Sequence, residues 1–123
     1  MAVTAERGIS APPEVVFDTA TDPARSPAWL PDPLRTVPGA AEFAATGGLD
    51  DPDPVAMRAE WHAEGDGSAG AWTAVLHVRR LPAGGAAVRL DLDGAGSRPA
   101  RARMAQESLA ALARAVADNL SAG

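Results

Sequence analysis

The residues best suited to acid–base or metal chemistry in this sequence are two histidines and a group of aspartates. His62 and His77 each occupy a polar position in a segment that alternates apolar and polar side chains, so both are expected to face water. Neither is then placed to share a metal ion or to act as the base of a nucleophile–histidine pair. Asp50, Asp51 and Asp53 lie in GGLDDPDP, but the Gly and Glu that complete an EF-hand calcium loop do not follow at the required positions. We expect a solvated acidic turn there and no metal site.

Other reactive side chains are scarce. The sequence has no Cys and no Tyr, so it offers no thiolate nucleophile, no disulfide and no thiolate zinc site. Arg7 shares the parity of Val3 and Ile9 in a predicted first strand. It is a candidate anchor for a carboxylate inside a cleft or, alternatively, an arginine that extends to the rim. Asp32 and Arg35 are weaker candidates at the mouth of such a cleft, and no residue is assigned as catalytic.

Charge and composition exclude several classes of partner. The chain of 123 residues has a net charge of −5 and an isoelectric point near 4.8, which argues against binding to nucleic acid or to an anionic membrane. The opening MAVTAERGISAPPE lacks the apolar core of a signal peptide, and no run reaches the length of a membrane span. We therefore expect one cytoplasmic domain over residues 1–123. All basic residues are Arg and none is Lys, which we interpret as the signature of a GC-rich bacterial genome.

The strongest structural signal is an amphipathic helix over residues 97–120. Ser97 or Arg98 is placed to cap it, and Pro99 suits its first turn. Ala, Leu, Gln, Glu and Arg dominate the segment, so helix propensity agrees with the pattern. The predicted buried stripe, at helical spacing, is Ala102, Ala105, Leu109, Leu112, Val116 and Leu120. Such a helix needs an apolar sheet on which to lie.

The preceding segments predict that sheet. Antiparallel strands with one wet face are predicted by alternating apolar and polar residues over 55–61, 72–78 and 88–92. Residues 2–10 form a further predicted strand, and 34–37 and 41–46 are weaker candidates. Between the first strand and these segments, Pro12 opens one short helix, and a second, one-turn helix ends at Trp29.

This order of elements and two blocks of sequence resemble the polyketide cyclase/dehydrase and START-like superfamily, whose fold is the helix-grip. The front block, ISAPPEVVFDTATDPARSPAWLP, is the more specific of the two, and the back block, GSRPARARMAQESLAALARAVADNL, matches by position and amphipathicity. The resemblance implies an α+β fold in which a long C-terminal helix grips a curved antiparallel sheet, with two short helices after the first strand. Members of the superfamily bind hydrophobic small molecules between sheet and helix; some are aromatase/cyclases and others carry lipids or quinones.

Pairing the strands through their turns predicts a register for the inward face. It places Trp61 opposite Trp72 and Ala59 opposite Ala74, while a slip of two residues preserves which side chains point inward. The row of alanines has two interpretations: a void that accepts a flat apolar ligand, or a closer approach of the helix that leaves no void. The predicted lining of a ligand site is Arg7, Trp29, Met57, Ala59, Trp61, Trp72, Ala74, Leu76, Leu90, Met104, Leu109 and Leu112.

Three functions are consistent with this sequence. The first is non-catalytic binding of a hydrophobic small molecule such as a lipid, a quinone or a polyketide. The second is a polyketide cyclase or dehydrase, although such chemistry needs polar groups inside the cleft and the inward positions are apolar. The third is an interaction module without a ligand that pairs with itself as a homodimer or with a partner. No strand–GxGxxG–helix unit is present, and no cofactor is expected.

Overall fold

The computed structural model describes residues 2–22, 24–31, 34, 42–46, 56–63 and 71–122. Within these residues the chain forms strands and helices in the order that the sequence predicts. The elements are β1 (Val3–Ile9), α1 (Pro13–Thr21), α2 (Ser26–Trp29), β2 (Glu42–Thr46), β3 (Ala56–Ala63), β4 (Trp72–Arg80), β5 (Ala86–Asp93) and α3 (Arg98–Ala122).

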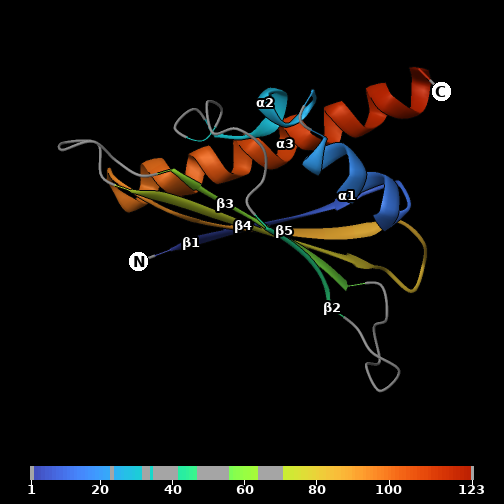
Figure 1. Cartoon of the computed structure of the whole chain (residues 1–123), viewed down its shortest axis with the longest axis horizontal. Helices are drawn as coiled ribbons and strands as arrows, with labels where there is room; N and C mark the ends of the chain where they lie inside the picture. The colour runs from blue at the N-terminus through green and yellow to red at the C-terminus, as the bar shows by residue number, and fades with distance from the viewer. Residues whose placement is uncertain are drawn as a thin grey trace.

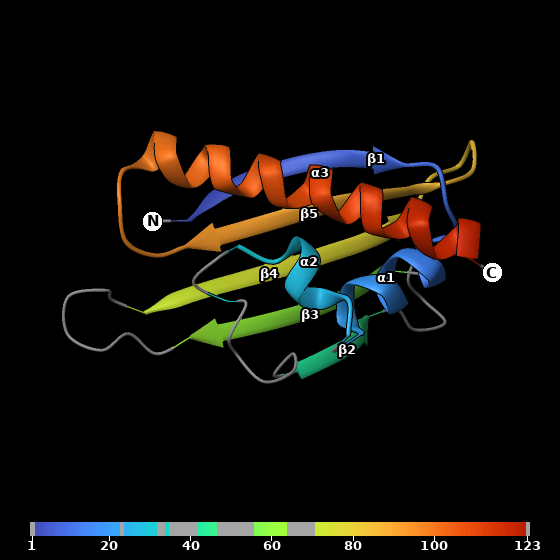
Figure 2. The same ribbon diagram turned by 90° about the horizontal axis from the view of Figure 1, so that it is seen from above.

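The strands make one antiparallel sheet with the order β1-β5-β4-β3-β2. Figure 1 shows the helices gathered on one face of this twisted sheet. Figure 2 shows α3 running along β1 and β5, while α1 and α2 lie over the other half of the sheet. The opposite face carries none of the described helices. This is the predicted α+β architecture, a curved antiparallel sheet gripped by a long C-terminal helix.

The core lies between the sheet and the helices. Along β4 every second side chain is buried, and the side chains between them are less so, because successive residues of a strand point to opposite faces. The inner face of the sheet meets a stripe of α3 whose side chains are at most 1% exposed: Ala105, Leu109, Leu112 and Val116. Burial of each Leu or Val stabilises the fold by about 1.5–3 kcal/mol before the loss of conformational entropy is subtracted.

The observed register corrects one prediction. Trp61 lies opposite Ala74 and Ala59 lies opposite Leu76, a shift of two residues along β4 from the predicted pairing. The parity is unchanged, so the same side chains still point inward. The predicted row of alanines does not form, because each Ala now lies beside a large side chain. Small and large residues therefore interdigitate, which favours close packing over a void.

The start of α3 is as predicted, but its end differs. The Ser97 hydroxyl accepts a hydrogen bond from the backbone N–H of Ala100, at 3.2 Å, and so caps the first turn. Leu120 was predicted on the buried stripe, but it is 49% exposed. Leu120 belongs to the last turns of α3, which extend beyond the end of β1 (Figure 2). Ala102, also on the predicted stripe, is only partly buried.

The connections between elements match the sequence in part. The predicted strand over 41–46 is present as β2. Leu34 belongs instead to a turn, in which its N–H donates to the carbonyl of Pro31 at 2.8 Å. The rest of the predicted 34–37 strand, the acidic turn over 47–54 and the candidate mouth residues Asp32 and Arg35 lie outside the described residues.

Candidate functional site

Two tryptophans form the centre of the inner face. Trp29, at the end of α2, and Trp61, on β3, are both fully buried, and their rings meet edge to face with centroids 5.3 Å apart. The indole N–H of Trp29 donates to the carbonyl of Ala20 at 3.0 Å, which joins α2 to the end of α1. This bond adds to the backbone hydrogen bond from Ser26 to Asp22, at 2.8 Å, in joining α2 to the end of α1.

The indole N–H of Trp61 is different. It is buried, and among the described residues it has no hydrogen-bond partner. A buried donor without an acceptor costs about 1–3 kcal/mol. It is also an unused hydrogen-bond donor within an otherwise apolar wall.

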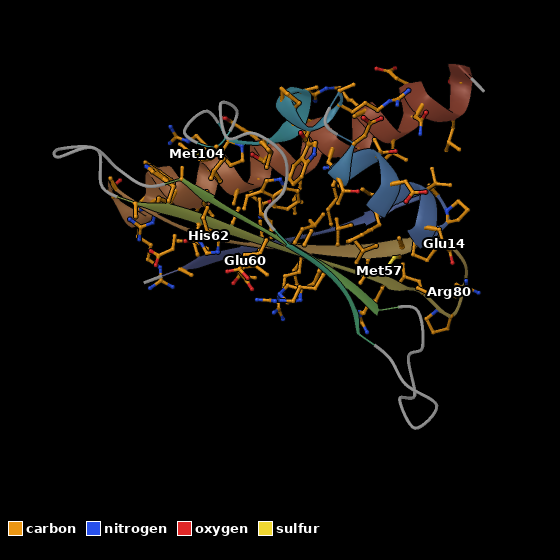
Figure 3. The ribbon with its side chains drawn as sticks, in the orientation of Figure 1. Glu14, Met57, Glu60, His62, Arg80 and Met104 are labelled. Atoms are coloured by element: carbon orange, nitrogen blue, oxygen red, sulfur yellow. The ribbon has the colours of Figure 1, made fainter. Side chains whose placement is uncertain are left out.

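A groove of about 460 Å³ lies between α2 and α3, directly over Trp29. Ala28 and Pro31 form its α2 side, and Met104 and Ala111 give α3 an apolar wall. Ser108, which is only 5% exposed, adds a hydroxyl to this wall. The outer rim is charged, with Arg103, Glu107 and Arg114 along α3. Figure 3 shows Met104 in the helical layer above the sheet.

The predicted ligand-lining residues do not all come together. Those that are completely buried between sheet and helices are Trp29, Ala59, Trp61, Ala74, Leu76, Leu90, Leu109 and Leu112. Met57 and Met104 are partly buried against the same cluster. Trp72 is 8% exposed, and its ring packs over the backbone of Gly94. Two of the predicted residues, Trp29 and Met104, line the groove between α2 and α3, whereas Arg7 and Met57 line a separate hollow among the strands.

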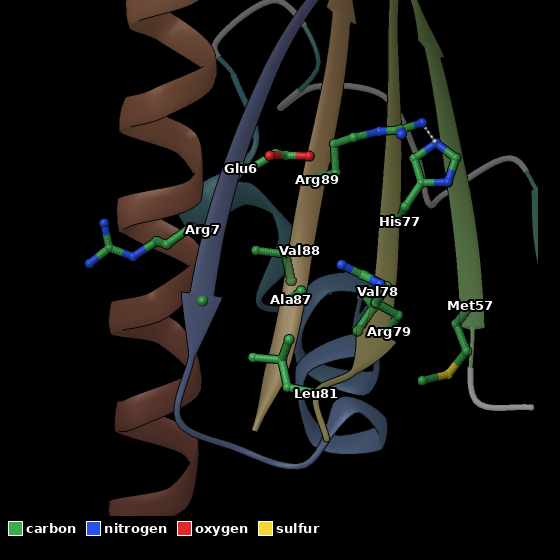
Figure 4. Close-up of a pocket in the computed structure, with 11 residues that line it drawn as sticks. Glu6, Arg7, Met57, His77, Val78, Arg79, Leu81, Ala87, Val88 and Arg89 are labelled. Atoms are coloured by element: carbon green, nitrogen blue, oxygen red, sulfur yellow. Dashed lines mark hydrogen bonds between the residues drawn. The ribbon is translucent and has the colours of Figure 1, made fainter. Parts of the chain in front are cut away.

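Arg7 lies at the rim. It has the parity of Val3 and Ile9, yet its side chain is exposed, because β1 is an edge strand of the sheet. Figure 4 shows the guanidinium extending beyond β1 on the side of α3. The geometry favours the rim interpretation of this residue over an anchor inside the cleft.

The histidines lie on the outer face, as predicted. The side chain of His62 is 53% exposed and that of His77 is 36% exposed. Burial of the imidazole and then the charge of Arg89 lower the pKa of His77 from its ordinary value of 6.5, although Asp91 acts in the opposite direction. Arg89 lies 3.2 Å from Nε2 of His77, and a carboxylate oxygen of Asp91 lies 3.3 Å from the same nitrogen. Asp91 also accepts from Thr4 at 2.7 Å, which links β1 to this network.

Sequence reasoning missed part of the groove. Met104, Ser108 and Ala111 recur at helical spacing one position beside the predicted stripe, so the pattern contained a signal for a second, flanking face. The unpartnered indole of Trp61 had no such signal, because it depends on which atoms surround it in space. Among the residues that the structure places, no three His, Asp or Glu side chains are arranged to hold a metal ion.

This fold, with its buried inner face beneath a long C-terminal helix, is that of the START-like helix-grip proteins. The chain resembles a START superfamily protein from Mycobacterium smegmatis over 98% of its own length and 97% of that chain, with a TM-score of 0.57 and 14% sequence identity. A protein from Mesorhizobium loti aligns over 96% of this chain and 98% of its own, with a TM-score of 0.59 and 14% identity. A protein from Chromobacterium violaceum aligns over 94% of this chain and 96% of its own, with a TM-score of 0.58 and 19% identity.

These identities are low, so the likeness establishes the fold and leaves the activity open. No protein-family model matches the chain, and no curated protein matches it. None of the helices within the described ranges is both long enough and apolar enough to cross a membrane.

Proposed function

We propose that this chain, as a single domain over residues 1–123, binds a largely apolar small molecule that carries a hydrogen-bond-accepting oxygen. The ligand enters through the groove between α2 and α3 and lies against Trp29 and Trp61. The function is binding rather than catalysis, and polyketides, quinones and lipids with a carbonyl group fit this description. The resemblance of the fold to a START superfamily protein supports a ligand-binding role in general.

The observation that carries the proposal is the buried N–H of Trp61 without a partner. Folding removes this donor from water without giving it an acceptor, whereas a ligand carbonyl in contact with it restores a hydrogen bond. The neighbouring ring surfaces provide stacking and apolar contact for a flat molecule. The same donor is of no use to a saturated hydrocarbon, so the wall selects for an oxygen-bearing ligand.

Access requires movement of α2, because Trp29 is fully buried beneath the groove. This helix has four residues, Ser26–Trp29, and the hydrogen bond from its indole to the Ala20 carbonyl is one that a ligand can replace. Displacement of one indole opens the groove toward Trp61. The space then filled by ligand lies against Leu109 and Leu112, two of the buried residues predicted from the sequence.

The experiment compares two probes that differ in one oxygen. Purified protein labelled with ¹⁵N is titrated with 1-acetylnaphthalene, which has a carbonyl group, and with 1-ethylnaphthalene, which has none. We expect the ketone to bind about tenfold more tightly, because one recovered hydrogen bond contributes about 1–1.5 kcal/mol. The indole N–H resonance of Trp61 is expected to move downfield only with the ketone.

Trp61→Phe provides the decisive variant and Trp72→Phe the matched control, since Trp72 lies on the neighbouring strand. Trp61→Phe should remove the preference for the ketone, while Trp72→Phe should retain it. Equal affinity for the two probes, or a preference that survives in Trp61→Phe, would overturn the proposal. Native mass spectrometry of freshly purified protein tests the same idea without a chosen probe, since an apolar molecule bound during expression adds its mass.

A further inference from the structure

A second hollow, of about 710 Å³, lies on the face of the sheet opposite to the helices. Its described lining comes from β1, β3, β4, β5 and the turn after β4, and no described helix contributes to it. Val78 and Val88 are among the lining residues, yet each is 1% exposed because its side chain points into the core. The space is therefore on the outer side of the strands and separate from the groove over Trp29.

Two small residues create this hollow, which we call the outer trough. Gly8 on β1 lies directly opposite Ala87 on β5, and Ala87 lies opposite Arg79 on β4. Arg79 is therefore the one long side chain in the row of Gly8, Ala87 and Arg79, whereas the next row on this face, Glu6, Arg89 and His77, has three. A Cβ added at Gly8 meets nothing within 4 Å, which shows that the floor is open there. Leu81 bounds the trough near the β4–β5 turn.

The next row of the sheet forms the wall. It runs from Glu6 through Arg89 to His77 across three strands. Arg89 donates to His77 and, at 3.2 Å, to Asp91. Figure 4 shows Arg89 and His77 joined above the strands at one end of the trough, with Arg79 and Leu81 toward the other.

The charge of the outer trough is opposite to that of the whole chain. The chain has a net charge of −5, but Arg79 and Arg89 are diagonal neighbours on this face, and Glu6 is the one acidic side chain among the described residues that line it. Within the described part of the chain, Arg79 has neither an ion-pair nor a hydrogen-bond partner, whereas the adjacent Arg80 pairs with Glu14 on α1 at 3.0 Å. Glu14 and Arg80 are labelled together in Figure 3.

This arrangement suits an organic carboxylate. A guanidinium group has a planar set of donors that matches the two oxygens of a carboxylate, and Arg79 and Arg89 line the trough from adjacent strands. The floor of Gly8 and Ala87, with Leu81 beside it, offers apolar contact to the body of the molecule. A small inorganic anion gains nothing from that floor.

We propose that the outer trough is a second binding site, for an organic carboxylate whose charged group lies between Arg79 and Arg89 and whose apolar body lies over Gly8 and Ala87. The site is independent of the proposed function of the inner face. The indole N–H of Trp61 reports binding at the inner site, whereas the backbone amides of Gly8 and Ala87 report binding in the outer trough. The two proposals are therefore tested separately.

The test is a titration of the ¹⁵N-labelled full chain with 2-naphthoate, followed at the backbone amides of Gly8 and Ala87 and at the His77 ring. The uncharged 2-naphthamide and inorganic phosphate are titrated in parallel. We expect 2-naphthoate to shift these resonances and to raise the pKa of His77, since a nearby anion favours the protonated ring. The amide and phosphate should bind at least about tenfold more weakly, because the amide lacks the negative charge and phosphate lacks the apolar body.

Three variants complete the test. Arg79→Gln should weaken 2-naphthoate about tenfold, while Arg80→Gln, which removes the same charge from the other face, should have little effect. Gly8→Val fills the floor where an added Cβ meets open space, so it should abolish binding in a protein that remains folded. Binding that survives Gly8→Val, equal loss in Arg79→Gln and Arg80→Gln, or equal binding of phosphate would each overturn the proposal.

Discussion

The ring of Trp29 meets the ring of Trp61 at an interplanar angle of 82°, and only one of the two indole N–H groups has an acceptor. The pair thus combines a favourable edge-to-face contact with an unsatisfied donor on one partner. Removal of either indole leaves a similar loss of ring volume, so the two changes differ mainly in the fate of one hydrogen bond. This asymmetry gives a direct test of the inner site in the absence of any ligand.

Trp29→Phe is expected to destabilise the protein more than Trp61→Phe. The first change loses both ring volume and the hydrogen bond to Ala20, which together cost about 2–4 kcal/mol. The second loses ring volume but also removes a buried donor that had no partner, so the net cost should stay within about 1 kcal/mol of zero. Urea unfolding followed by circular dichroism measures both. Equal destabilisation by the two variants would show that the Trp61 indole is satisfied in solution.

Gly94 packs so closely against Trp72 that any side chain at this position meets the indole. A Cβ built at Gly94 overlaps the six-membered part of the ring. Gly94→Ala should therefore destabilise the fold by about 1–3 kcal/mol through overpacking. The matched change Gly8→Ala, where the new Cβ meets nothing within 4 Å, should be neutral or stabilise by about 0.5–1 kcal/mol, because Gly is unfavourable within a strand.

A double variant separates the clash from backbone effects at Gly94. If the indole is the obstacle, Gly94→Ala should cost much less in a Trp72→Leu background than in the natural chain. The thermal unfolding midpoints of the four proteins measure this coupling. A cost that is unchanged by Trp72→Leu would place the strain in the backbone of the turn instead.

The parity of each strand was predictable from the sequence, because alternation of apolar and polar residues fixes which side chains face the core. The pairing of Trp61 with Ala74 was not, since a slip of two residues buries the same side chains. That slip decides whether alanines align into a void or lie beside large residues, so the shape of the inner face could not be predicted even though its buried side chains could. The exposure of Leu120 was missed for a related reason, as helical periodicity carries no information on where the sheet ends.

His77 is expected to make the protein less stable at mildly acidic pH. Its folded-state pKa lies below the ordinary value of 6.5, so the unfolded chain binds the proton more readily in the range below 6.5. Stability therefore falls as the pH drops from about 6.5 toward the folded-state pKa. Arg58 and Arg89, which face the ring from β3 and β5, contribute to this shift, and Asp91 opposes it.

The pH dependence is measured by urea unfolding at about pH 7.5 and about pH 5. The difference in stability between the two conditions should be smaller in His77→Gln than in the natural chain. His62→Gln, which removes the other imidazole from the same face, serves as the control. A difference that is unchanged in His77→Gln would assign the acid sensitivity to carboxylates such as Asp22, whose pKa is lowered by the N–H of Ala24 and by Arg25.

The grip of α3 on the sheet is tested by two leucines on the same helix. Leu112, in the middle of α3, is completely buried against the sheet, whereas Leu120, near the end of the helix, is 49% exposed. Leu112→Ala should cost about 2–5 kcal/mol, since it removes buried apolar atoms and leaves a cavity. Leu120→Ala should cost less than about 0.5 kcal/mol, because the side chain is largely in water in both states. Both substitutions replace Leu by Ala within a helix, so intrinsic propensity cancels and the difference reports packing against the sheet. Similar costs at the two positions would mean that α3 does not bury its central stripe against the sheet, and α3 would then not cover the inner site.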